Sequence, residues 1–185
     1  MNRFSILVGD ITRSRAQAIA NAANTTLLGG SGVDGAIHAA AGPELLAECR
    51  TLGGCETGQA RLTRGYRLPA RYVLHTPGPI WRGGQEGEAA LLASCYRSCL
   101  TLAESRGIES LDFPSISTGV YGYPLTQAAP VALKAIMDFL RDHALPRQVR
   151  LVCHTRETAA VYRQVWNMWY AGTKEERLPE EPETI

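Results

Sequence analysis

The feature that most constrains the fold of this chain is the regular alternation of short strand-like segments with longer helix-like ones. Strand formers gather at residues 4–8, 70–75 and 149–153, with weaker candidates at 17–22, 59–63 and 110–113. Apolar residues recur at helical spacing between them, which predicts helices at 33–41, 43–52, 88–105, 126–143 and 158–170. Such alternation predicts an α/β layer structure with a largely parallel sheet covered on both faces.

The length of 185 residues favours one domain, which we place at residues 1–172. From Thr173 onward five acidic residues stand against two basic ones. This segment has almost nothing to bury, so residues 173–185 are expected to form an acidic, disordered tail. No apolar run approaches the length needed to cross a bilayer, and no signal peptide is evident. The chain is therefore expected to be soluble and cytoplasmic, with no membrane partner.

Cysteine and charge patterns exclude several classes of protein. The five cysteines are odd in number and form no C-x-x-C pair, so we expect a reducing compartment and no metal site. The fingerprints of P-loop and dinucleotide-binding proteins and of the nucleophile elbow are absent, so we expect no cofactor and no covalent catalysis. The net charge is +1, and the mildly basic body lacks a clustered Lys/Arg stripe. RNA binding is compatible with this composition but is not required by it.

Three of the predicted strands are followed by small, polar or glycine-rich segments. These lie at residues 9–11, at 21–38 and at 114–123. Ligands of open α/β sheets bind outside the carboxyl ends of the strands, so these segments predict a binding site. Glycine lets the backbone approach a ligand closely, and helix N-termini offer free N–H groups. Two such loops are suited to bracketing a diphosphate, although tight turns would explain either loop alone.

Five motifs carry a more specific signal: Gly9-Asp10-Ile11, Asn21-Ala-Ala-Asn24, Gly29-Gly-Ser-Gly-Val-Asp-Gly-Ala-Ile-His38, His75-Thr-Pro-Gly-Pro79 and Ser115-Ile-Ser-Thr-Gly-Val-Tyr-Gly-Tyr123. In this order they resemble the macrodomain family, specifically its MacroD-type branch of ADP-ribose hydrolases. The resemblance spans about residues 3–170. It implies a three-layer α/β/α fold with a mixed, largely parallel sheet. It also implies binding of ADP-ribose and its esters, and hydrolysis of O-acetyl-ADP-ribose or of ADP-ribose on acidic side chains of modified proteins.

The resemblance also implies roles for individual residues. Asp34 would polarise or orient the attacking water near the distal ribose, although an acid at a helix start also stabilises the helix dipole. Asn24 would bind ribose hydroxyls, and Tyr121 would lie over the distal ribose, unless it is merely an exposed loop residue. His38 falls one helical turn after Asp34, on the same face, and is expected to support it.

The adenine end is assigned in the same way. Asp10 would accept a hydrogen bond from the adenine amino group with the Ile11 backbone alongside, although it is also placed to cap the turn into Thr12. Two positions depart from the family pattern. Ser31 replaces a glycine, and its Cβ narrows the loop if that position needs a positive φ. His154 replaces an aromatic residue against adenine, which predicts weaker stacking.

The predicted site thus has two parts. The catalytic set is Asp34, Asn24 and Tyr121. The ligand-binding set is Asp10, Ile11, Asn21, Gly32, Val33, Gly35, His38, Ser117, Thr118, Gly119, Val120, Gly122 and His154, with Asn21 expected to brace its loop.

Two functional hypotheses follow from these residues. The leading one is an enzyme in which water attacks the ester or the ribose carbon that bears it. Asp34 or a phosphate of the substrate would assist the water. The alternative is a non-catalytic ADP-ribose reader or RNA-binding regulatory module. The Asp34-Gly35 pair favours the enzyme.

Overall fold

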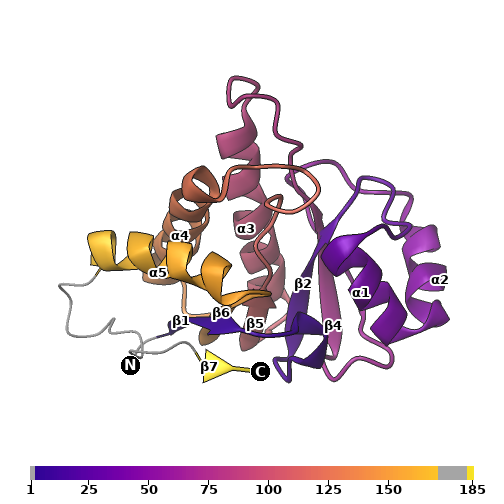
Figure 1. Cartoon of the computed structure of the whole chain (residues 1–185). Coiled ribbons are helices and arrows are strands. Elements are labelled where there is room, and N and C mark those ends of the chain that lie inside the picture. The colour runs from indigo at the N-terminus through magenta and orange to yellow at the C-terminus, as the bar shows by residue number, and fades with distance from the viewer. Residues whose placement is uncertain (1–2, 171–182) are drawn as a thin grey trace.

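A computed structural model describes residues 3–170 and 183–185, and these residues contain a seven-stranded sheet (Figure 1). The strands are β1 Phe4–Val8, β2 Ala18–Ala23, β3 Arg61–Arg64, β4 Tyr72–Pro77, β5 Ser110–Phe113, β6 Gln148–Cys153 and β7 Glu183–Thr184. Their order across the sheet is β3-β4-β2-β5-β6-β1-β7. Only the β3–β4 pair is antiparallel among these strands, so the sheet is mixed and largely parallel, as predicted.

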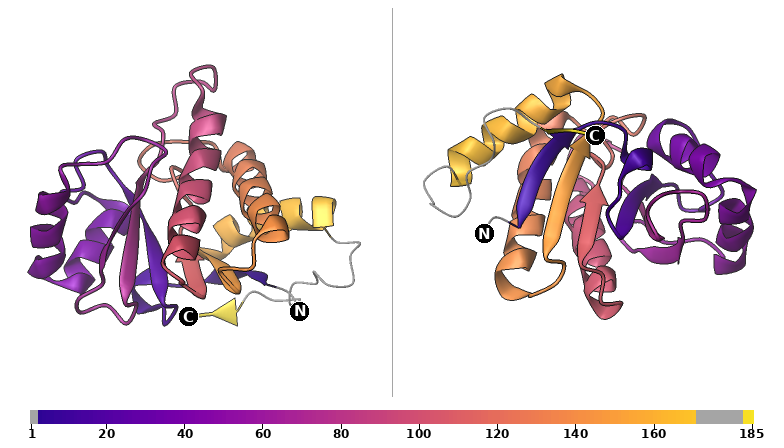
Figure 2. Two further views of the ribbon diagram at one scale, coloured as in Figure 1. Left: turned by 180° about the vertical axis from the view of Figure 1, so that it is seen from behind. Right: turned by 90° about the horizontal axis from the view of Figure 1, so that it is seen from below.

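Helices cover both faces of this sheet. They are α1 Gly32–Ala41, α2 Pro43–Leu52, α3 Glu88–Ser105, α4 Leu125–Asp142 and α5 Arg156–Tyr170, with a short 3-10 turn, η1, at Ile11–Arg13. Figure 2 shows α1 and α2 grouped apart from α4 and α5. Helices α1 and α2 share one buried cluster with the sheet, while α3, α4 and α5 share the other. The predicted three-layer α/β/α fold is therefore confirmed.

The helical periodicity located the buried faces correctly. In α4 the residues Ala132, Ala135, Ile136, Phe139 and Leu140 are buried, and they follow the i, i+3, i+4, i+7 spacing of the predicted apolar face. At the end of this helix the His143 ring stacks on Phe139 with 3.9 Å between ring centroids. The predicted helix bounds differ from the observed ones by at most two residues.

Helix α4 contains an internal proline. The helix begins at Leu125, so Pro130 is its sixth residue. Its missing N–H leaves the Thr126 carbonyl without its usual i+4 donor. The buried residues of α4 lie on both sides of Pro130, and their packing stabilises the helix despite the missing hydrogen bond.

The predicted disordered tail lies mostly outside the described residues, because residues 173–182 are not among them. The last three residues differ from the expectation. Glu183–Thr184 pairs in parallel with Leu7 and Val8, and Ile185 packs against the apolar cluster under α1 and α2. Backbone pairing needs no apolar side chains, and for this reason composition did not reveal it. No helix in the described part of the chain is long and apolar enough to span a membrane.

Candidate active site

A cavity of about 740 Å³ opens at the carboxyl ends of β1, β2, β5 and β6. Its wall brings together segments that are more than 100 residues apart in the sequence, from Gly9 to Thr158. Twelve of the sixteen predicted site residues line it: Asp10, Ile11, Asn24, Gly32, Val33, Asp34, Ser117, Thr118, Gly119, Val120, Tyr121 and His154. The other four predicted residues do not line it: Asn21, Gly35, His38 and Gly122. Three of them lie behind the wall, because Asn21 and His38 approach Asp34 and Gly35 packs against Gly30.

The first glycine loop ends in the N-terminus of α1. Ser31 is the N-cap, but its side chain makes no capping hydrogen bond within the described structure. Its φ is −101°, so the expected steric penalty of serine at this position does not arise. Gly32 has a φ of +60°, which a residue with a Cβ adopts only with strain. The first turn of α1 therefore presents free N–H groups and the positive end of the helix dipole to the cavity.

Gly35 holds this loop against its helix from behind. A Cβ at Gly35 would lie 2.5 Å from the carbonyl oxygen of Gly30, which is too close for any side chain. The loop thus crosses the first turn of α1 in direct backbone contact. Gly35 therefore shapes the position of the loop without lining the cavity itself.

The second loop follows β5 and closes over the same cavity. Ser117 has a φ of +66°, and its buried Oγ has no hydrogen-bond partner among the described residues. A Cβ at Gly78 would lie 2.1 Å from that Oγ, so the loop packs tightly on the end of β4. The Trp81 N–H donates to the Tyr121 carbonyl at 2.9 Å, which ties the far side of the loop to the chain after β4. The Ser117 hydroxyl is therefore directed at Gly78, while the backbone of the loop lines the cavity.

Asp34 is the carboxylate at the closed end of the cavity. It is 5% exposed, and its Oδ1 accepts a hydrogen bond from Asn21 Nδ2 at 2.8 Å. His38 Nε2 lies 3.5 Å from the same oxygen. Burial raises the pKa of Asp34, and the Asn21 hydrogen bond and His38 oppose that rise. Tyr121 shares this environment, because burial and then the Asp34 charge raise the pKa of its phenol.

Asn21 in β2 and Asn24 just after this strand have different partners. Asn24 Nδ2 donates to the Gly29 carbonyl at 2.8 Å, and its Oδ1 accepts from Thr26 Oγ1 and Leu27 N. Asn24 still lines the cavity, with one amide N–H left for a ligand. Asn21 is fully buried, and its amide lies within hydrogen-bond distance of Asp34 on α1 and His75 on β4 rather than of its own loop.

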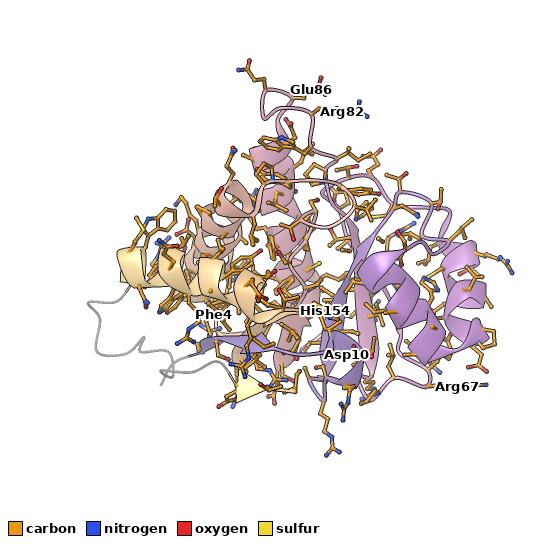
Figure 3. All side chains as sticks on the ribbon, in the orientation of Figure 1. Phe4, Asp10, Arg67, Arg82, Glu86 and His154 are labelled. Carbon is orange, nitrogen blue, oxygen red and sulfur yellow. The ribbon has the colours of Figure 1, made fainter. Side chains whose placement is uncertain are left out.

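Asp10 and His154 mark the other end of the cavity, where β1 and β6 end side by side (Figure 3). Asp10 caps η1, because its Oδ1 accepts from both the N–H and the hydroxyl of Thr12. The hydroxyl bond from Thr12 is the main cause that lowers the pKa of Asp10. Asp10 is exposed and lines the cavity, so capping the turn does not exclude binding a ligand.

The charge of this cavity restricts what can neutralise an anion. Its described lining contains two carboxylates, one imidazole and one phenol, but no lysine or arginine. A bound phosphate would depend on backbone N–H groups and on the helix dipole of α1. Across the described residues, no group of three or more His, Cys, Asp or Glu side chains is arranged to hold a metal ion.

Comparison with known proteins agrees with the geometry. Residues 20–132 match the family model described as Macro domain. The chain is a macrodomain. An O-acetyl-ADP-ribose deacetylase of Salmonella gallinarum is 52% identical over 168 residues, covering 89% of this chain and 94% of that protein.

Solved macrodomain structures match the fold closely. The Oceanobacillus iheyensis macrodomain with ADP has a TM-score of 0.87 and 42% identity, covering 91% of this chain and 92% of that one. The Trypanosoma brucei macrodomain in complex with ADP-ribose has a TM-score of 0.82 and 46% identity, covering 88% of this chain and 68% of that one.

Sequence reasoning missed some residues of the macrodomain site. Thr155 caps α5 through its hydroxyl and lines the cavity with Thr158, whereas we expected that helix to begin only at Thr158. The spacing Thr-x-x-Thr before an apolar repeat was the available signal. His75 and Gly78 belong to the motif His75-Thr-Pro-Gly-Pro79, but the sequence suggested no role for either residue. Their roles depend on contacts across strands, which no local pattern encodes.

Proposed function

We propose that this macrodomain binds ADP-ribose and hydrolyses ADP-ribosyl esters. The substrates would be O-acetyl-ADP-ribose and mono-ADP-ribose attached to acidic side chains of proteins. The observation that carries this proposal is the placement of Asp34, a nearly buried carboxylate with a raised pKa, at the closed end of a cavity whose other lining suits a nucleotide.

The cavity offers a complementary group for each part of the ligand. At the open end the Asp10 carboxylate would accept from the adenine amino group, with the Ile11 backbone and the His154 ring beside it. The N-terminus of α1 and the loop at residues 117–120 would hold the diphosphate through backbone N–H groups.

At the closed end Asn24, Asp34 and Tyr121 would surround the distal ribose. Water would attack the ester carbonyl carbon or the ribose carbon that bears the ester. A new bond forms to the water oxygen, the carbon–oxygen bond to the leaving group breaks, and one water proton is transferred to a base. After attack at the carbonyl carbon the base returns this proton to the departing ribose oxygen, whereas attack at the ribose carbon releases a carboxylate that needs no proton. Asp34 would orient this water and accept the proton. A substrate phosphate could replace Asp34 as the base, in which case Asp34 would only orient the water.

The direct test is to incubate the protein with O-acetyl-ADP-ribose and, separately, with a protein mono-ADP-ribosylated on glutamate. Free ADP-ribose is followed by mass spectrometry. We expect release from at least one substrate under single-turnover conditions. Tight binding of ADP-ribose without any release would identify a non-catalytic reader and reject the enzyme.

Replacing Gly35 by alanine is expected to weaken ADP-ribose binding by at least about tenfold, because the new methyl group displaces the Gly30 carbonyl and the first glycine loop with it. Isothermal calorimetry measures the affinity, and the melting temperature serves as a check of folding. An unchanged affinity would show that the loop does not hold the ligand.

Replacing His154 by tyrosine is expected to tighten ADP-ribose binding and to leave turnover of bound substrate nearly unchanged. The larger ring adds stacking surface at the end of β6, whereas Asp34 lies on α1. Calorimetry and single-turnover rates separate the two effects. Equal or weaker affinity would remove His154 from the adenine pocket.

A further inference from the structure

A buried chain of hydrogen bonds runs from the active-site carboxylate to the antiparallel edge of the sheet. It passes from Asp34 on α1 through Asn21 on β2 and His75 on β4 to Thr63 on β3. The distances are 2.8 Å from Asn21 Nδ2 to Asp34 Oδ1, 3.1 Å from Asn21 Nδ2 to His75 Nδ1, and 2.8 Å from His75 Nε2 to Thr63 Oγ1. Asn21, Thr63 and His75 are fully buried.

One consistent set of donor and acceptor roles runs through this chain from Thr63 to Asp34. When the Thr63 hydroxyl donates to the Arg64 carbonyl at 3.1 Å, its oxygen is free to accept from His75 Nε2–H. A neutral imidazole carries one proton, so His75 Nδ1 is then an acceptor and receives one N–H of Asn21. The amide of Asn21 has a second N–H, and that one points at Asp34.

We propose that His75 is a positioning residue for Asp34, with Thr63 selecting the His75 tautomer that keeps both N–H groups of Asn21 directed at their acceptors. This inference rests on the proposed role of Asp34 in hydrolysis. The hydrogen-bond geometry itself does not depend on that role.

The opposite tautomer shows why the assignment matters. A proton on Nδ1 would face the Asn21 N–H groups, and the amide would have to flip to present its oxygen. That oxygen would then lie against the Asp34 carboxylate, where two acceptors repel unless Asp34 is protonated. The tautomer of His75 is therefore coupled to the charge of Asp34.

The groups around the imidazole favour its neutral form. The ring of His38 on α1 lies 6.4 Å away, the Cys49 thiol on α2 lies 3.8 Å from Nε2, and Asp34 is reached through Asn21. Burial, with a smaller contribution from His38, lowers the pKa of His75 to about 3. Around Asp34 the remaining titratable neighbours are His38 and the Tyr121 phenol.

The first test is independent of catalysis and uses 15N-labelled histidine in the whole protein. NMR is expected to show His75 protonated at Nε2 and unprotonated at Nδ1, with no titration between pH 5 and pH 8. A proton on Nδ1, or a His75 that titrates in this range, would overturn the proposal.

The second test compares three threonine variants by 13C NMR of the Asp34 carboxyl group. Thr63→Val removes the Nε2–H acceptor and leaves the weakly accepting Cys49 thiol, so the Asp34 pKa is expected to rise. Thr63→Ser keeps the hydroxyl and is expected to restore it. Thr76→Val is the matched control, because the adjacent buried Thr76 donates to the Gln59 carbonyl and does not contact His75 in any described hydrogen bond.

Kinetics then connect the geometry to the reaction. For the ester substrate, Thr63→Val is expected to lower kcat by about three- to tenfold, the scale of one hydrogen bond. His75→Phe is expected to lower it by about 10- to 100-fold. The KM should stay nearly constant, and the acidic limb of the pH profile should move to higher pH. If Thr63→Val leaves the Asp34 pKa and the acidic limb where Thr76→Val leaves them, the proposal is wrong.

The two proposals fail in different ways. A wild-type protein that releases no ADP-ribose from either ester contradicts the hydrolytic function, while the His75 tautomer and the Asp34 titration still decide the positioning role. A hydrolytic protein with an Nδ1-protonated His75 contradicts only the positioning role.

Discussion

Replacing Asp34 by asparagine is expected to lower turnover of an ADP-ribosyl ester by about 10²- to 10⁴-fold, the scale of lost general-base assistance. The change removes the charge and basicity but keeps the volume and the oxygen that accepts from Asn21. Burial raises the pKa of Asp34 in the folded protein, so at neutral pH its ionised form is a cost to folding. The melting temperature is therefore expected to be unchanged or higher.

The matched control for this variant is Asp10→Asn, the same chemical change at the adenine end. It keeps the oxygen that accepts from Thr12 and is expected to raise KM while leaving kcat nearly unchanged. An Asp34→Asn protein that hydrolyses within about threefold of wild type would reject the catalytic assignment. Asp34 would then be only a link between α1 and β2.

Replacing Arg150 by methionine is expected to cost about 3–5 kcal/mol of unfolding free energy, because it strands a buried carboxylate. Arg150 donates to both oxygens of Asp112 at 2.8 Å, and the Asp112 side chain is only 1% exposed. Ser14 Oγ would remain as a donor at 2.5 Å, but it carries no charge. Urea unfolding of the two proteins measures the difference.

The double variant Asp112→Leu with Arg150→Met separates the lost attraction from the stranded charge. We expect it to recover most of the loss, because apolar replacements of a buried ion pair are often tolerated. A single Arg150→Met variant within about 1 kcal/mol of wild type would show instead that water reaches Asp112 and solvates it.

The architecture was largely readable from local patterns. Apolar runs predicted the strands and helical spacing predicted the helices. The bounds of β5 and α2 were predicted as observed. The helical spacing predicted α4 at residues 126–143, and the buried residues of this helix follow that spacing. The antiparallel β3–β4 pair and the pairing of β7 with β1 were not predicted, because strand partners depend on what the rest of the sheet leaves open.

The site was readable at the level of segments. The rule that ligands bind beyond the carboxyl ends of strands selected the loops that line the cavity. The sequence did not show which residues of those loops face the ligand and which hold the loop in place. Asn24 was assigned to the ligand, and the structure adds that its amide oxygen and one N–H also hold the loop. Ser31 was expected to narrow the loop only if its position needed a positive φ, and its φ is −101°.

The sequence by itself determined which segments form strands and helices and where the glycine loops fall, because these follow from residue type and spacing over a few turns. Only the tertiary structure decided which carboxylate is buried and which donors surround it. Four elements contribute to this chain and meet only when the sheet forms; their residues are Asp34, Asn21, His75 and Thr63. The hydrogen bonds among them require each side chain to be placed to within a few tenths of an ångström. The environment that raises the pKa of Asp34 is therefore a product of the packed fold, since no local pattern specifies it.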